Sequence, residues 1–223
     1  MSIQAKFAAV AAALCATPAV AQAPDAGCAP QGLVHVVVRN VTPGLAPTDP
    51  TAQPREIWRQ GSAFLRSVEA APGGQRMIIV SEPNIWLVDT ARGEARHAVD
   101  PGPTLAVHAP VLPVEGTPGP LLRLEFGCEA QFVAAYAPRA ERQVDVGGLQ
   151  AGLHTVTVGD HAVAILMDEA RQVPISVGYL RAGQPKFLVR YDVYERNLLA
   201  NPQLFAPPKG MEIVGGPTAQ TSD

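Results

Sequence analysis

The residues best suited to catalysis or metal binding in this 223-residue chain are five scattered histidines: His35, His97, His108, His154 and His161. His154 and His161 flank one expected hairpin, where a hydrolase could combine them with nearby carboxylates such as that of Asp168. No two histidines have the spacing of metal ligands, and the G-x-S-x-G, H-E-x-x-H, Walker and G-x-G-x-x-G motifs are absent. We therefore expect no catalytic residue, no metal, no cofactor and no enzymatic activity.

A second polar group of interest is an arginine within an apolar run. Arg66 shares a strand face with Phe64 and Val68, whereas Leu65 lies on the other face. If the face of Phe64 and Val68 is interior, the Arg66 guanidinium needs buried hydrogen-bond partners. If the face of Leu65 is interior, Arg66 is solvated. The sequence leaves both readings open.

The composition excludes several classes of protein. Apolar residues make up 47% of the chain and charged residues 17%, which excludes a disordered, highly charged polypeptide. The net charge is −3 and no block of basic residues occurs, so no nucleic-acid partner is expected. Beyond the N-terminus, no apolar run is long enough to cross a membrane.

The N-terminus has the pattern of a secretory signal peptide. Lys6 precedes the short apolar stretch 7–16, and Ala19-Val20-Ala21 fits signal peptidase, so we expect cleavage after Ala21 and Sec-dependent export to the periplasm. Cleavage removes Cys15 and leaves Cys28 and Cys128. In an oxidising compartment this pair predicts a disulfide, and two buried free thiols are the alternative.

The mature chain alternates with the period of β-strands. About ten short strands are expected, with Gly, Pro or Asn near most breaks. They are 33–38, 56–60, 63–69, 76–81, 85–89, 95–99, 153–158, 162–167, 173–180 and 187–194. One amphipathic helix is expected over Leu122–Tyr136, although Gly127 weakens it. This pattern predicts an antiparallel meander that either closes on itself or curves around an apolar hollow.

Two stretches carry a family resemblance. The first contains Glu56-Ile57-Trp58-Arg59-Gln60-Gly61, Phe64–Glu69, Met77–Val80 and Ile85–Asp89. The second runs from Leu166 through Val189–Tyr194 to the ending Leu204-Phe205-Ala206-Pro207-Pro208-Lys209-Gly210 and Val214. In this order the segments resemble the LolA-like superfamily of outer-membrane lipoprotein-sorting and periplasmic lipid-carrier proteins.

The resemblance implies a mainly β (α+β) fold: a curved antiparallel half-barrel of about ten strands, with a short helix as a lid. It also implies a concave face that holds acyl chains, and a lid-tethering role for Arg66. The residues expected to line the apolar cavity are Ile79, Trp86, Ile175, Val177, Phe187, Val189 and Tyr191.

These observations predict a signal peptide over 1–21, an N-terminal extension over 22–32, a single β domain over 33–214 and a disordered tail over 215–223. We expect a monomeric periplasmic carrier of a lipid, acyl chain or lipoprotein, with a role in outer-membrane lipoprotein handling. The alternative is an envelope interaction or sensor module that has a closed core and docks another envelope protein.

Overall fold

The computed structural model describes residues 28–100 and 107–215, so the expected signal peptide lies outside the described residues. Within them, one sheet contains twelve strands. The strands are β1 (Leu33–Asn40), β2 (Arg55–Gln60), β3 (Phe64–Ala71), β4 (Gly74–Ser81), β5 (Asn84–Asp89), β6 (Glu94–Val99), β7 (Arg142–Val146), β8 (Leu149–Val158), β9 (His161–Asp168), β10 (Val173–Arg181), β11 (Gln184–Leu198) and β12 (Glu212–Val214). All ten expected strands are present.

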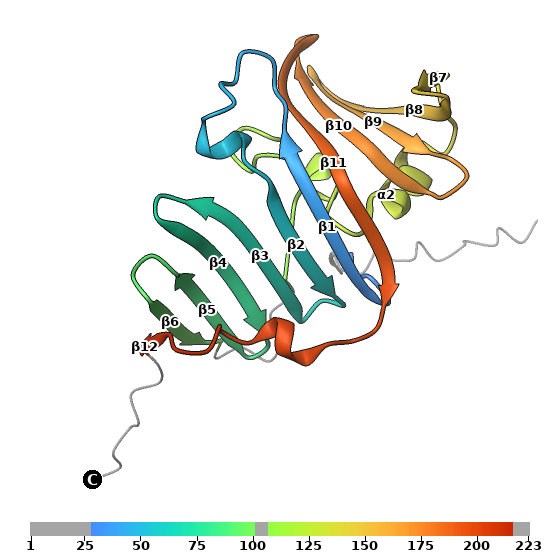
Figure 1. Ribbon diagram of the computed structural model, residues 1–223. Helices are drawn as coiled ribbons and strands as arrows, with labels where there is room; N and C mark the ends of the chain where they lie inside the picture. The colour runs from blue at the N-terminus through green and yellow to red at the C-terminus, as the bar shows by residue number, and fades with distance from the viewer. Residues whose placement is uncertain (1–27, 101–106, 216–223) are drawn as a thin grey trace, which may run out of the picture.

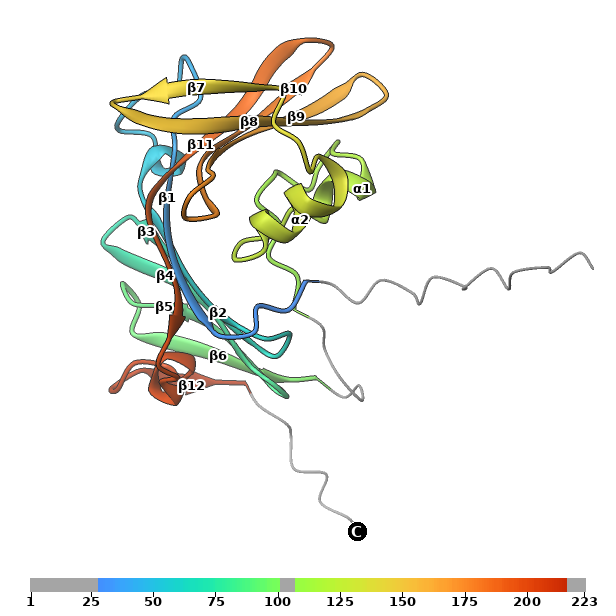
Figure 2. The ribbon, with the colours of Figure 1, turned by 90° about the vertical axis from the view of Figure 1, so that its right-hand side faces the viewer.

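The sheet consists of two antiparallel meanders joined through β1. Strands β1 to β6 pair in sequence, and β7 to β11 form the second meander, whose last strand returns to pair with β1. Short turns make this pairing local: Ala182 and Gly183, both with positive φ, connect β10 to β11 in the manner of a type I′ hairpin. Figures 1 and 2 show the resulting sheet, which curves strongly and stays open.

Two strands were missed by sequence analysis. Strand β7 is short, exposed and partly charged, so its alternation carries little apolar signal. Strand β12 follows the 3₁₀ helix η2 (Pro202–Phe205) and pairs in parallel with β6 over three residues. Such a pairing depends on where the chain returns and not on local pattern.

The prediction of one helix over Leu122–Tyr136 was wrong. The structure has two short helices, α1 (Gly119–Leu122) and α2 (Glu129–Tyr136). Gly127 between them has a φ of 87°, a left-handed conformation that ends helical geometry. The intervening residues instead bond to an extended segment, from Phe126 N–H to Ala109 O and from Val111 N–H to Leu124 O. Both helices lie in the hollow of the sheet (Figure 2).

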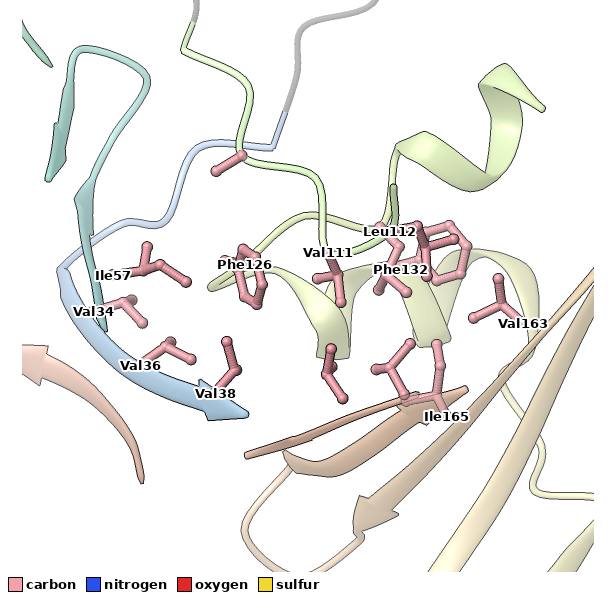
Figure 3. Packing of buried hydrophobic residues seen from close by; sticks show 14 of the residues in the cluster. Val34, Val36, Val38, Ile57, Val111, Leu112, Phe126, Phe132, Val163 and Ile165 are labelled. Atoms are coloured by element: carbon pink, nitrogen blue, oxygen red, sulfur yellow. The ribbon is translucent and has the colours of Figure 1, made fainter. Parts of the chain in front are cut away.

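The two faces of the sheet carry separate apolar cores. On the concave face, Val34, Val36 and Val38 of β1 pack against Phe126 and neighbouring residues of the helical region (Figure 3). On the convex face, Phe205 of η2 packs over strands β3 to β6. Each fully buried aliphatic side chain contributes roughly 1.5–3 kcal/mol to the stability of the fold. Burial therefore holds the helical region on the concave face and η2 on the convex face.

Two cysteines are placed to form a disulfide: Cys28 in the segment before β1 and Cys128 at the start of α2. The Cα atoms of Cys28 and Cys128 are 6.1 Å apart, within the range that a disulfide spans, and 100 residues separate them in sequence. A disulfide between them would tie the start of α2 to the segment before β1.

Replacing both cysteines, in the variant Cys28→Ala/Cys128→Ala, is expected to lower the free energy of unfolding by about 2–5 kcal/mol, because the unfolded chain regains the freedom of a long loop. Urea unfolding of the mature protein measures this change. The wild type under reducing conditions should reproduce the variant's midpoint. An unfolding midpoint of the wild type that reductant leaves unchanged would contradict the crosslink.

Candidate functional site in the concave face

Strand register arranges the concave side chains of β2 to β6 in three rows, because alternate residues share a face. The rows are Ile57, Ser67, Ile78, Leu87 and Arg96; Arg59, Leu65, Val80, Ile85 and Ala98; and Arg55, Glu69, Arg76, Asp89 and Glu94. The first two rows are mainly apolar and the third is fully charged. The face is therefore an apolar floor with a charged margin.

Residues 107–136, here called the covering segment, fill only part of this hollow. Val107, Ala109, Val111 and Leu112 are buried against the sheet. Beyond them, Ile78 is 45% exposed, Leu87 53% and Val114 64%. The sheet thus has more concave apolar surface than its own chain covers.

An open groove occupies the uncovered part. It has a volume of about 510 Å³ and runs between β2–β4 and the covering segment. Its apolar lining includes Leu65, Ile78, Val80, Leu112 and Val114. A second hollow, of about 430 Å³, shares Ile78 and continues over Leu87 to the charged margin. Volumes of this size match those of small-molecule sites.

A larger hollow lies elsewhere. It has a volume of about 680 Å³, and its lining comes from the covering segment and Cys28, with no strand residue among it. His108, Glu125, Phe132 and Tyr136 are among the lining side chains. This hollow is a surface feature of the covering segment, so the apolar floor of the sheet does not contribute to it.

Arg59 holds the covering segment against the sheet. Its side chain is 1% exposed, and its terminal nitrogens donate to Phe126 O at 3.0 Å, Val107 O at 2.9 Å and Cys28 O at 2.6 Å. The guanidinium also lies 2.6 Å from the buried Glu125 carboxylate. One side chain of β2 therefore fastens both ends of the covering segment's extended part and the N-terminal segment.

His108 completes this network at the surface. Its Nδ1 lies 2.7 Å from the Glu125 oxygen that does not face Arg59. The His108 side chain is exposed, and it lines both the groove and the larger hollow. The buried carboxylate thus has a partner on each side, as a carboxylate taken out of water requires.

Arg66 lies on the opposite, convex face. Its Nη1 donates to Leu204 O of η2 at 3.2 Å, and its Nη2 lies 3.6 Å from Met77 Sδ. Arg66 therefore contacts the C-terminal cover, whereas the contact with the covering segment belongs to Arg59. Sequence analysis missed Arg59, although its spacing of two residues from Ile57 places both side chains on one strand face.

The apolar residues predicted to line a cavity divide between the two faces. Val177 and Val189 are buried in the concave core, and Phe187 and Tyr191 pack against it beneath the chain's own covering segment. Ile79 and Trp86 belong to the convex core under η2. Ile175 lies at a break in the β9–β10 register and is half-buried. Their contact with a ligand stays a prediction.

The two histidines considered for catalysis are held in separate contacts. His154 is buried, with Nδ1 at 2.7 Å from Ala137 O and Nε2 at 2.7 Å from Glu169. His161 contacts the Tyr179 hydroxyl and Asp160. Over residues 28–100 and 107–215, no group of three His, Cys, Asp or Glu residues is placed to hold a metal.

A buried carboxylate fastens α2 to the sheet. Glu129 accepts hydrogen bonds from the hydroxyls of Tyr191 and Tyr194 on β11, each at 2.8 Å. Burial raises the pKa of Glu129 above its ordinary value, and the hydrogen bonds oppose that rise. Burial and the Glu129 charge together raise the pKa of both tyrosines, so their hydroxyls stay protonated as donors.

Two comparisons by sequence identify no family: no protein-family model matches the chain, and no curated protein matches it. Across residues 28–100 and 107–215, no helix has both the length and the apolar character needed to traverse a bilayer. The architecture itself is the open, curved antiparallel half-barrel that the sequence predicts.

Comparison with solved structures gives low-identity alignments. An uncharacterized conserved protein from Thermus thermophilus aligns with a TM-score of 0.49 and 12% identity, over 83% of this chain and 91% of that chain. MucB in the Pseudomonas aeruginosa MucA/MucB complex aligns with 0.45 and 12%, over 83% and 59%. A LolA superfamily protein from Nitrosomonas europaea aligns with 0.32 and 12%, over 80% and 91%. These scores lie below 0.5, so the fold assignment rests on the geometry described above.

Replacing Arg59 by methionine is expected to lower the free energy of unfolding by about 3–5 kcal/mol, because Glu125 is left buried without its counter-charge. Urea unfolding of Arg59→Met measures this loss. The exposed Arg76 of the same sheet is the matched control, and Arg76→Met should change stability by less than about 0.5 kcal/mol. In Arg59→Met/Glu125→Gln the two losses should not add, since the second substitution removes the stranded charge. Full additivity would contradict the coupling.

Glu129 should make stability fall as pH rises. A carboxyl whose pKa is raised by folding stabilises the protein below its unfolded value, and this contribution disappears as pH rises through the folded value. The ordinary pKa of this carboxyl is 4.5. As pH rises above it, the free energy of unfolding of Glu129→Gln should increase relative to that of the wild type by up to about 1.4 kcal/mol per pH unit, until Glu129 ionises in the folded protein. Urea unfolding across this range measures the difference, and a difference independent of pH would contradict the raised pKa.

Proposed function

We propose that this protein is exported to the periplasm and binds the acyl chain of a lipid or lipoprotein in the concave groove. The observation that carries the proposal is the uncovered apolar floor, where Ile78, Leu87 and Val114 remain exposed beside a hollow of about 510 Å³. An acyl chain laid on this floor would gain roughly 0.8 kcal/mol for each methylene removed from water.

The covering segment determines where a ligand reaches the floor. Arg59, Glu125 and the disulfide position fix this segment at the β1–β2 side of the hollow. Val114, in the same segment, is 64% exposed and lines the open groove. The acyl chain therefore enters along the Val114 edge, while the segment around Arg59 stays in place.

The sequence resemblance to the LolA-like superfamily supports the same class of function and the role in outer-membrane lipoprotein handling. The signal-peptide pattern supports the periplasmic location. The open groove favours a carrier over the alternative, an envelope sensor or interaction module with a closed core.

The test is binding of a single-chain lipid to the mature protein after delipidation. We expect native mass spectrometry to show one bound lipid on the wild type. Ile78→Asp should weaken this binding at least about tenfold, because burying an ionised carboxylate beneath an acyl chain is costly. The control is Leu199→Asp, since Leu199 is 91% exposed and lies outside the groove. This control should bind as the wild type does.

Two results would overturn the proposal. A wild-type protein that retains no lipid at any concentration tested would point to the closed-core interaction module. Equal weakening by Ile78→Asp and Leu199→Asp would place the lipid outside the concave groove.

A further inference from the structure

Two arginines of β2 lie on the concave face, separated by one residue of that face, in contrasting surroundings. Arg59 has a carboxylate partner, Glu125, at 2.6 Å and three backbone carbonyls. Arg55 lines the groove and makes one hydrogen bond, from Nε to Ser67 Oγ at 2.9 Å. Over the described residues, its terminal nitrogens have no hydrogen-bond partner and no carboxylate within ion-pair distance.

Arg55 is also held in a defined position. Its guanidinium carbon lies 5.8 Å from the centre of the Phe126 ring, a cation–π contact that adds to the hydrogen bond with Ser67. The side chain is therefore anchored on one side by the sheet and on the other by the covering segment. A guanidinium fixed in this way loses little further freedom when it binds a ligand.

Glu69 is the neighbouring carboxylate of Arg55 in the charged row, and it does not form an ion pair with the guanidinium. Burial lowers the pKa of Arg55, and the carboxylate of Glu69, its neighbour across the β2–β3 register, offsets part of that effect. The guanidinium remains charged at all physiological pH values. A part-buried cation without an ion pair gains from an anion that enters the groove.

We infer that Arg55 binds the carboxylate of a long-chain fatty acid whose acyl chain occupies the concave groove. This inference rests on the proposed function and narrows its ligand to a lipid with a free carboxylate. The two terminal nitrogens of Arg55 present a planar fork that matches a carboxylate in a bidentate arrangement. The apolar residues Leu65, Ile78 and Val80 continue from this point along the groove and face the chain.

The test compares palmitate with its methyl ester, which has the same chain but no charge. Affinities are measured by displacement of a neutral fluorescent probe, N-phenyl-1-naphthylamine, from the delipidated mature protein. The wild type should prefer palmitate by about tenfold to a hundredfold, the range that a charge-assisted hydrogen-bonded pair supplies.

Substitutions then assign the preference to Arg55. Arg55→Gln should lower the affinity for palmitate by at least about tenfold and leave the affinity for the ester unchanged. Arg55→Lys, which keeps the charge, should retain part of the preference. Arg142 of β7 is exposed and lines neither the groove nor the second hollow, so Arg142→Gln should behave as the wild type. Circular dichroism of each variant confirms that it is folded.

The outcomes separate the two proposals. Equal affinity of the wild type for palmitate and ester overturns the role of Arg55 and leaves the acyl-chain carrier intact; this comparison needs no variant. A preference for palmitate that survives in Arg55→Gln also overturns the assignment to Arg55. Binding of neither compound overturns the proposed function itself.

Discussion

The buried contact between Arg59 and Glu125 is the constraint on which the rest of the concave face depends. A paired charge inside a protein adds little net stability, but removing one partner is costly, so the pair selects one arrangement of the chain. Here it fixes an extended segment and two short helices over part of the sheet. The position of this cover decides which apolar side chains are core and which remain open.

The two faces of the sheet differ in how far their apolar side chains are covered. The convex face is closed by η2, whose Phe205 packs on strands that carry alternate apolar residues. The concave face is closed over β1 and β9–β11 but remains open over β4 and β5. The extended segment and the two short helices do not fill the hollow of this strongly curved sheet, so part of its apolar floor stays exposed.

Arg55 and Arg59 show that the partners of a buried arginine, and not its burial alone, determine what the side chain does. Both lie on the concave side of β2, and burial costs both of them solvation free energy. Arg59 recovers that cost from the chain itself, through Glu125 and backbone carbonyls, and becomes structural. Arg55 regains only part of it, from the hydrogen bond to Ser67 and the contact with Phe126, and it lines the apolar groove.

The sequence by itself determined the strands, because a period of two fixes which side chains share a face whatever the rest of the chain does. It also predicted a disulfide between Cys28 and Cys128, with two free thiols as the alternative. It could not decide which face each row covers, so Ile79 and Val177 were assigned to one cavity although they lie in opposite cores. It likewise singled out Arg66 for contact with the lid and did not consider Arg59. Tertiary structure decided these points, because the partners of Arg59 lie as far as 67 residues away in the chain and no local pattern records such a contact.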